Sequence, residues 1–400
     1  MQVLEKSVLL RHQPGRAPIG GFVTYVSATE PVLLRRNGWE IGDDVHDDFY
    51  DRTSRDNGLT WGDPIASLRS TPVASGHMIF VENAAIFLPR RNRLVAFTNL
   101  RFEPSLAKAH RGYSGKLQIM VSEPLGKDQG EIFVTDFGLK QGVMVSFCHP
   151  IEDSQSRILV PVQWQKMDAN GSIRAQGFRA REDLPNVMLD VWAVGLLVGE
   201  FQGGQALVWR LHGAVPCAFG KSSRGMCEGT VAELSDGRLA MILRGSNQHW
   251  PDKPGRKWLS FSDNGGVSWS EVQPLCWDDG SMPESSATGS ALFRSVKNGK
   301  LYWMGNLCRQ GERANGNMPR SPLIITEVQE APFALRRDTL TIIDQRAAHE
   351  DERVQMSNFR FYQDRVNGQV VLFLTRYGER GSANGKWLEA DHYQYRIALE

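Results

Sequence analysis

Apolar and polar residues alternate along the chain in short runs, and pairs of these runs are separated by tight polar turns. Five such pairs span residues 84–100, 149–164, 228–246, 289–307 and 357–377. Asp-Gly or Asn-Gly stands at the turn in three of them, at residues 236–237, 298–299 and 367–368. These dipeptides between apolar runs are the strongest short-range signal for a β-hairpin. The pattern therefore predicts five antiparallel hairpins, and segments with helical periodicity are scarce.

The hairpins recur along the chain with a period of about 60 to 80 residues. Further apolar runs follow four of these hairpins, starting at Leu117, Lys257, Ser321 and His392. A two-sheet sandwich would give turn signals every 8 to 12 residues or so and no such repeat. With the N-terminal region as a sixth unit, the pattern predicts an all-β fold, a six-bladed β-propeller in which residues 1–400 form a single domain. We expect the C-terminal strand to close it by completing the first blade and hiding its edges.

Two short segments, half the chain apart, share the same order of residue types. Residues 54–61 read Ser-Arg-Asp-Asn-Gly-Leu-Thr-Trp and residues 262–269 read Ser-Asp-Asn-Gly-Gly-Val-Ser-Trp; we name them the first and second turn motifs. A hydroxyl, an Asp or Asn, and a Gly suited to positive φ are the residues of a hairpin turn. The motifs resemble the Asp box of the sialidase (neuraminidase) superfamily, also called the BNR repeat, with Asn264 where Asp is usual. That resemblance implies structural turns on the outside of propeller blades.

Composition and charge exclude several classes of protein. The chain is 41% hydrophobic and 23% charged, and its 46 basic and 45 acidic residues give a net charge of +1. We therefore expect no nucleic-acid partner, and no apolar run approaches the ~20 residues of a membrane span. The opening apolar run is too short for a signal-peptide core, so the chain as given is predicted to be cytoplasmic. Its five cysteines lack a C-x-x-C spacing, and we expect reduced thiols, no metal and no cofactor.

Glu228 and Arg244 are the first candidate site residues. They open and close a predicted hairpin whose turn is Asp236-Gly237, so the chain reversal brings them to the same end of one sheet. The whole segment 227–244 resembles the sialidase segment in which a Glu opens a strand and an Arg closes the next one. The resemblance implies a catalytic Glu228 and a substrate-binding Arg244. An ordinary ion pair at a sheet edge is the alternative.

Two further arginines resemble the carboxylate-binding arginines of sialidases. Arg320 immediately precedes an apolar strand, and Arg16 stands in Gly15-Arg16-Ala17-Pro18-Ile19, similar to the family's Arg-Ile-Pro signature with Ala17 for Ile. The resemblance implies that Arg16, Arg244 and Arg320 bind a substrate carboxylate through charge-assisted hydrogen bonds. Three such arginines predict an acidic ligand.

The acidic segment 42–48 lies where sialidases carry their acid/base Asp. We favour Asp47, with Asp44 next, because general-acid work needs a carboxyl that holds its proton, and clustered carboxylates repel one another into that state. A solvated acidic loop or an adventitious cation site is the alternative.

The sialidase nucleophile is missing. The family uses a Tyr at the start of the sixth blade, where this chain reads Gln355-Met356-Ser357-Asn358. Tyr377, on the following strand, matches a position that is not the family's nucleophile. A carboxylate that activates water opposite an acid carboxyl would instead give an inverting hydrolase, with the two groups about 6.5–9.5 Å apart.

The sequence thus predicts a sialidase-like, exo-acting glycoside hydrolase with a carbohydrate substrate, plausibly ending in an acidic sugar. A second hypothesis is a polysaccharide lyase in which His149 abstracts a proton next to a uronate carboxylate. A third is a non-catalytic carbohydrate-binding propeller. None of these hypotheses fixes the oligomeric state.

Overall fold

The computed structural model describes residues 1–42, 44–74, 76–103, 115–125, 130–139, 142–166, 189–203, 206–383 and 385–399. In this part of the chain 26 β-strands and two short 3-10 helices form six antiparallel sheets of four or five strands each. The chain divides into two compact units. The first unit comprises residues 1–145, 295–299 and 345–400, and the second comprises 146–294 and 300–344.

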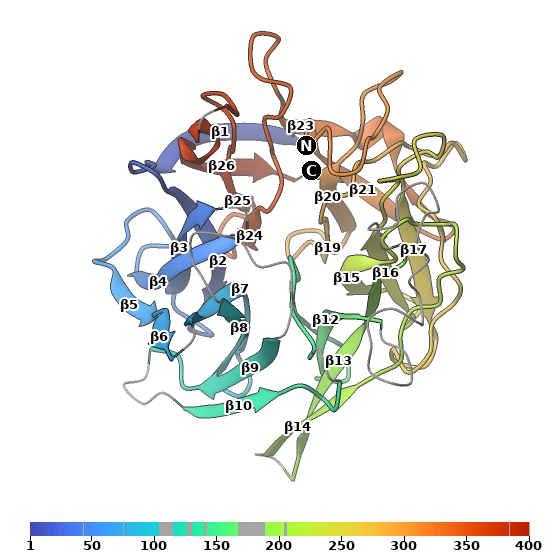
Figure 1. Ribbon diagram of the computed structural model, residues 1–400. Helices are drawn as coiled ribbons and strands as arrows, with labels where there is room; N and C mark the ends of the chain where they lie inside the picture. Colours follow the sequence, from blue (N-terminus) through green and yellow to red (C-terminus); the bar gives the residue numbers. More distant parts are fainter. Residues whose placement is uncertain are drawn as a thin grey trace. The chain divides into compact units, whose positions relative to one another are not determined.

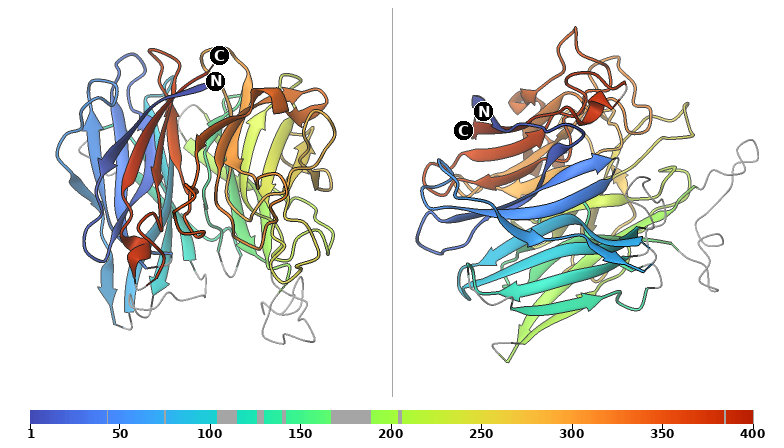
Figure 2. Two further views of the ribbon diagram at one scale, coloured as in Figure 1. Left: turned by 90° about the horizontal axis from the view of Figure 1, so that it is seen from above. Right: turned by 60° about the vertical axis from the view of Figure 1, so that its left-hand side comes forward.

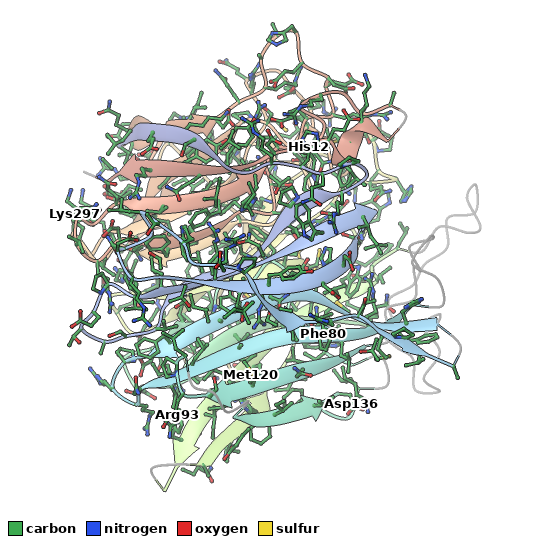
Figure 3. The ribbon with its side chains drawn as sticks, turned by 90° about the vertical axis from the view of Figure 1, so that its left-hand side faces the viewer. His12, Phe80, Arg93, Met120, Asp136 and Lys297 are labelled. Atoms are coloured by element: carbon green, nitrogen blue, oxygen red, sulfur yellow. The ribbon has the colours of Figure 1, made fainter. Side chains whose placement is uncertain are left out.

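The first unit holds three sheets, with strand orders β2-β3-β4-β5, β6-β7-β8-β9-β10 and β1-β26-β25-β24 (Figure 1). Its elements are β1 (Gln2–Leu10), β2 (Ala17–Tyr25), β3 (Leu33–Gly42), β4 (Val45–Ser54), β5 (Ile65–Leu68), β6 (Thr71–Val73), β7 (Gly76–Leu88), β8 (Arg93–Glu103), β9 (Gly115–Ser122), β10 (Glu131–Thr135), β24 (Arg360–Gln363), β25 (Val370–Thr375), η2 (Lys386–Leu388) and β26 (His392–Ala398). Figure 3 views part of this unit from the side, with Phe80 on β7 and Met120 on β9 in one sheet.

The second unit holds the other three sheets, with orders β11-β12-β13-β14, β15-β16-β17-β18 and β19-β20-β21-β22, and with β23 also paired to β21. Its elements are β11 (Ile151–Glu152), β12 (Ile158–Gln165), β13 (Trp192–Gln202), β14 (Ala206–Leu211), β15 (Cys227–Glu233), β16 (Leu239–Arg244), β17 (Lys257–Ser262), β18 (Gln273–Pro274), β19 (Ala291–Arg294), β20 (Leu301–Asn306), β21 (Leu323–Glu330), β22 (Phe333–Leu335), η1 (Arg337–Thr339) and β23 (Thr341–Asp344).

All five predicted hairpins are present. They are β7/β8, β11/β12, β15/β16, β19/β20 and β24/β25, each paired antiparallel. At the β15/β16 turn Gly237 has φ +84°, a left-handed conformation that glycine adopts without the strain of a Cβ. Hairpins are local structures, so alternation of apolar residues and turn chemistry were enough to predict them.

The pairing of the two chain ends differs from the prediction. The sheet β2-β3-β4-β5 is complete without the C-terminal strand, which is instead the third strand beside β25. The N-terminal strand β1 adds to that last sheet, from Gln2 opposite Ala398 to Leu10 opposite His392. Figure 2 shows both chain ends side by side. The short apolar run at the N-terminus is thus an edge strand that pairs with β26. The edge of the last sheet is therefore covered by the N-terminal strand, whereas the prediction had the C-terminal strand cover an edge of the first sheet.

Each unit has its own buried apolar clusters. In the second unit one cluster contains Met241 and Trp269, and in the first another contains Leu33, Tyr362 and Phe373. No helix within the described ranges is long and apolar enough to cross a membrane. The described residues also contain no group of three or more His, Cys, Asp or Glu side chains that could hold a metal ion.

Candidate functional site

Glu228 and Arg244 meet at one end of the β15/β16 hairpin in the second unit. Arg244 stands opposite Cys227 in the register, and its Nη1 forms a hydrogen-bonded ion pair with Glu228 Oε1. Both side chains are largely buried, at 11% and 13% exposed. The predicted pair is therefore in contact. Because burial strengthens charge–charge attraction, this pair is more than a surface contact.

The backbone at Glu228 is unusual. Its φ of +46° is left-handed, and the register of β15 and β16 is irregular between Cys227 and Thr230. The amide N–H of Glu228 donates to Gln163 Oε1 at 2.8 Å, which holds this turn of the chain against β12. Residues other than glycine adopt such a φ at a cost of the order of 1–3 kcal/mol, and such positions cluster at functional sites. The bulge aims the carboxylate out of the regular ladder.

One oxygen of Glu228 lacks a partner among the described residues. Oε2 is buried and lies within hydrogen-bonding range of no donor in the described part of the chain. A buried carboxylate oxygen without a donor costs free energy, so its place in the fold needs an explanation. A hydroxyl or water of a bound ligand would satisfy it.

Asn317 links Arg244 to Arg320. Arg244 Nη2 donates to Asn317 Oδ1 at 3.0 Å, and Arg320 Nε donates to the main-chain oxygen of Asn317 at 3.2 Å. The two predicted arginines are thus held by one residue of the loop that precedes β21. The sequence analysis did not identify Asn317 as a site residue, because nothing in its surroundings predicts that its amide reaches the end of another sheet.

A buried lysine, Lys257, lies on the neighbouring strand β17 beside Arg244. Lys257, opposite Arg244 in the ladder, donates from Nζ to the carbonyl and hydroxyl oxygens of Thr288 and to Ser286 O. Burial first, then Arg244, lower the pKa of Lys257 to about 7, while Glu228 opposes them. Glu228, Arg244, Lys257, Asn317 and Arg320 together form what we call the Glu228 cluster. The cluster holds three basic side chains and one carboxylate, and only Arg244 is paired with that carboxylate in the described contacts, which favours an anionic ligand.

His149 belongs to the same unit but has a different environment. Its ring packs edge-on against Phe147, with centroids 5.6 Å apart and planes at 89°. Phe147 in turn fills the space beside Gly289, where a Cβ would come within 2.1 Å of the ring. His149 thus makes an edge-on aromatic contact, and its role as a base stays a prediction.

Arg16 and Asp47 meet in the first unit. Arg16 Nη1 lies 3.6 Å from Asp47 Oδ2, and its guanidinium stacks on Trp39 at 4.6 Å from the ring centroid. Gln13 Oε1 accepts a hydrogen bond from Arg16 Nε at 2.9 Å. Both charged side chains are about one-third exposed, at 36% and 35%. The structure therefore brings together two of the predicted residues in a solvent-accessible pair.

The acidic segment was expected to be one loop that holds both Asp44 and Asp47. In the structure β4 begins at Val45 and separates them. Asp44 is in the tight turn with φ +57°, and its main-chain oxygen accepts from Arg101 Nη2 at 2.6 Å. Asp47 lies on β4 and its side chain faces Arg16. Between them His46 is fully buried, and burial lowers its pKa to about 4. The buried residues Val45 and His46 extend β4 into the acidic segment. Asp43 lies outside the described residues.

Tyr377 is buried and paired with a glutamate that the sequence analysis did not single out. Its hydroxyl donates to Glu40 Oε2, and its ring stacks on Trp387 with centroids 4.3 Å apart. Burial, followed by Glu40, raises the pKa of Tyr377 well above its ordinary value. A phenol that keeps its proton is a weak nucleophile unless a neighbouring base removes the proton. At neutral pH Tyr377 therefore donates to Glu40 as a neutral phenol.

Comparison with known proteins gives structural but no sequence matches. No protein-family model and no curated protein sequence matches the chain. A protein of unknown function from Dyadobacter fermentans aligns with 100% of this chain and 99% of its own, at 13% identity and TM-score 0.61. NanB sialidase from Streptococcus pneumoniae aligns with 98% of this chain and 70% of its own, at 11% identity and TM-score 0.62.

An intramolecular trans-sialidase from Ruminococcus gnavus is similar over 100% of this chain and 98% of its own, at 11% identity and TM-score 0.60. Identities this low establish architecture and leave activity open. The six antiparallel sheets agree with the architecture of these neighbours. The chain therefore has the sialidase-like six-bladed β-propeller fold.

Proposed function

We propose that the protein is a sialidase-like glycoside hydrolase that acts on the end of a glycan and recognises a terminal acidic sugar. The observation that carries this proposal is the Glu228 cluster, where a buried carboxylate oxygen, which no donor of the described residues reaches, lies beside Arg244. Solved structures with the same fold include a sialidase and an intramolecular trans-sialidase. Fold similarity alone does not carry function, so the residues of the cluster must do so.

Each member of the cluster has a proposed part in the reaction. Arg244 and Arg320 would bind the carboxylate of the sugar, because guanidinium groups pair with carboxylates through two parallel hydrogen bonds. Glu228 Oε2 would accept a proton from water or a substrate hydroxyl. Asn317 would hold the two arginines in place, since it accepts from both.

The residues of the first unit have separate proposed roles. Asp47 is our candidate for the general acid and Arg16 for a further carboxylate ligand, supported by their mutual distance of 3.6 Å and their partial exposure. Asp44 is the second choice, because its described contact is made by the main chain. Variants of these three residues test their roles independently of the Glu228 cluster.

We propose a mechanism without a tyrosine nucleophile. Met356 and Ser357 occupy the expected position and are buried, and Tyr377 holds its proton firmly. Direct attack of water on the sugar would invert the anomeric centre, whereas a covalent intermediate would retain it. Proton NMR of the first-formed product distinguishes the two stereochemical outcomes.

The central experiment replaces one atom of the proposed base. Glu228→Gln keeps the size of the side chain and an oxygen for Arg244, but removes the charge and the basicity. We expect kcat to fall about 100-fold or more, with little change in the melting temperature. Glu233→Gln is the matched control, since it lies at the other end of β15 and hydrogen-bonds Ser154. Unchanged turnover in Glu228→Gln would refute the assignment.

Arg320→Ala tests recognition of the acidic group. Loss of a ligand to the substrate carboxylate should raise KM for acidic substrates about 10-fold or more and leave neutral sugars unaffected. Arg309→Ala, an exposed arginine in the preceding segment, is the control. Equal losses on acidic and neutral substrates would argue against a carboxylate-binding pocket.

A glycan panel read by mass spectrometry separates the proposal from its alternatives. Hydrolysis adds one water to the products, whereas elimination does not and leaves an unsaturated sugar that absorbs ultraviolet light. The elimination product would favour the uronate lyase and a role for His149. Binding of a glycan without any released product would favour the non-catalytic propeller.

A further inference from the structure

Arg35, near the start of β3, is a buried arginine whose described contacts are aromatic. It is 3% exposed, and its Cζ lies 4.2 Å from the ring centroid of Trp61 and 5.9 Å from that of Phe373. Its Nε and Nη1 are buried and have no hydrogen-bond acceptor among the described residues. Aromatic faces attract a cation but do not replace acceptors for its N–H groups. The charge of Arg35 is therefore left without an anion in the part of the chain that the structure describes.

The corresponding position of another sheet is apolar. Leu33 pairs with Ser54 at the first turn motif, and two residues further Arg35 pairs with Arg52. Leu239 pairs with Ser262 at the second turn motif, and two residues further Met241 pairs with Ser260. Met241 is fully buried in an apolar cluster. The sheet architecture thus accepts an uncharged residue here, and the arginine is a specific feature of the first unit.

The surroundings of Arg35 add positive charge. Arg52 is directly opposite Arg35 on β4, and residues directly opposite one another share one face of a sheet. Burial, followed by Arg52, lowers the pKa of Arg35 to about 9, and Tyr362 is the one group that opposes them. The phenol of Tyr362 is not an anion at neutral pH, because burial raises its pKa well above the ordinary value. No carboxylate of the described residues contributes to this balance.

Two neighbouring side chains have further unused polar atoms. Trp61 Nε1 is buried and has no acceptor in the described part of the chain, which adds a third donor next to Arg35. His392, which experiences the charge of Arg35, has a buried Nε2 without a partner. Thr375 Oγ1 donates to Pro18 O at 2.5 Å, so His392 Nδ1 must donate to Thr375 and Nε2 is a bare acceptor. Arg52 Nη1 donates to Gly62 O at 2.9 Å, so the unmatched donors are those of Arg35 and Trp61, and a single acceptor cannot satisfy all three.

We propose that Arg35, Arg52 and Trp61 form a binding site for a small monovalent anion such as chloride. Removal of an arginine charge from water costs several kcal/mol unless a counter-charge compensates it. A halide is a spherical acceptor, so it can take hydrogen bonds from the guanidinium and the indole in whatever directions they point. A larger oxyanion or organic acid would have to displace packed aromatic rings. The occupant that competes with a halide is a buried water, which would bridge Arg35 and His392 Nε2.

The first test measures thermal unfolding of the full chain at constant ionic strength. Sodium chloride or sodium bromide is compared with sodium gluconate, whose anion is too large for a site among packed rings. An anion that binds only the folded state raises the melting temperature with concentration. We expect the halides to raise it by a few degrees in the wild type, and not in Arg35→Met, which copies the residue of the other sheet.

Matched variants separate specific binding from screening. Arg93→Met removes an exposed arginine whose side chain is 41% accessible, and should keep the full halide response (Figure 3). Arg52→Ser, which copies Ser260 of the other sheet, should weaken the response without abolishing it. Screening of surface charges would instead affect all variants to a similar degree.

The second test locates the ion in crystals of the wild type grown or soaked in bromide. We expect an anomalous peak in contact with the guanidinium of Arg35. An empty site, or a water there, would overturn the proposal. If a peak is present but halides raise the melting temperatures of the wild type and Arg35→Met equally, the peak is an adventitious ion only. That result would also overturn the proposal. If Arg35→Met does not fold, the bromide position in the wild type decides.

Discussion

The sheets β2–β5 and β15–β18 carry the same turn motif and differ in almost everything else that surrounds it. In both, the serine hydroxyl accepts a hydrogen bond from the amide of the glycine four residues later, at 2.8 Å. In both, the amide of the hydroxyl residue before the Trp donates to the Asp or Asn, at 2.9 Å. These two hydrogen bonds define the turn. They fix the hairpin and leave the interior of the sheet free to vary.

The two sheets differ in the pairing of a glutamate at the end away from the turn motif. In β15–β18 a carboxylate, Glu228, pairs with the cation of Arg244 and has one buried oxygen that no donor of the described residues reaches. In β2–β5 the carboxylate of Glu40 accepts from the phenol of Tyr377, which is neutral and buried. The comparison teaches that a shared turn predicts shared backbone geometry. Chemistry has to be established separately for each sheet.

Exchange of the interior residues should give the largest effect on this comparison. Met241→Arg would place a cation in a fully buried cluster whose members are hydrophobic side chains. We expect the free energy of unfolding to fall by about 3–5 kcal/mol, because an unpaired buried charge is among the most costly substitutions. Chemical denaturation followed by tryptophan fluorescence measures it.

Met241→Leu is the control, since a swap of similar volume costs less than about 1.5 kcal/mol. Equal stability of Met241→Arg and Met241→Leu would show that this interior tolerates a cation without an anion. In that case the absence of a counter-ion around Arg35 would lose its significance.

The two motif tryptophans give the next largest difference. Trp269 Nε1 donates to Gly266 O at 3.1 Å, whereas Trp61 Nε1 makes no such hydrogen bond and its ring stacks on Arg35. Trp269→Phe should lower the free energy of unfolding by about 1–3 kcal/mol, because a buried carbonyl loses its donor. Trp61→Phe should cost less than about 1 kcal/mol, because the Phe ring still presents a face to the guanidinium. Thermal unfolding of both variants in sodium gluconate, where no halide occupies the proposed site, checks the order, and a larger loss for Trp61→Phe would contradict it.

The parts of the molecule that could be predicted from the sequence are those determined by neighbouring residues. Alternating apolar runs determine a hairpin locally, with Asp-Gly or Asn-Gly turns as a further signal in three of the five, so all five hairpins were predicted. Glu228 and Arg244 followed, because the hairpin places its first and last residues together. The fold class then required only that such units repeat.

Contacts between distant segments could not be predicted in this way. The pairing of β1 with β26 joins the two ends of the chain, and Glu40 meets a tyrosine 337 residues away. Asn317 reaches Arg244 through the conformation of an irregular loop. Nor does the sequence around Arg35 reveal its burial, since arginine in an alternating strand normally predicts a solvent-facing position.

The smallest expected effect comes from the third residue of each motif, and it depends on pH. Asp56 accepts from the amide and hydroxyl of Thr60, whereas Asn264 accepts from the amide of Ser268 and donates to its hydroxyl. The hydrogen bonds from Thr60, and then that from Ser54, lower the pKa of Asp56 to about 2. A carboxylate with a lowered pKa in the folded state stabilises the fold fully above its unfolded pKa of about 4, and this contribution disappears as the pH falls towards about 2.

Asp56→Asn should therefore lower the melting temperature slightly at neutral pH and converge with the wild type in acid. Asn264→Asp should gain the same acid sensitivity, because Ser268 can donate to a carboxylate as Thr60 does. Melting curves between about pH 6 and about pH 2.5 measure both, and a pH-independent gap between wild type and Asp56→Asn would show that the charge of Asp56 has no part in the turn.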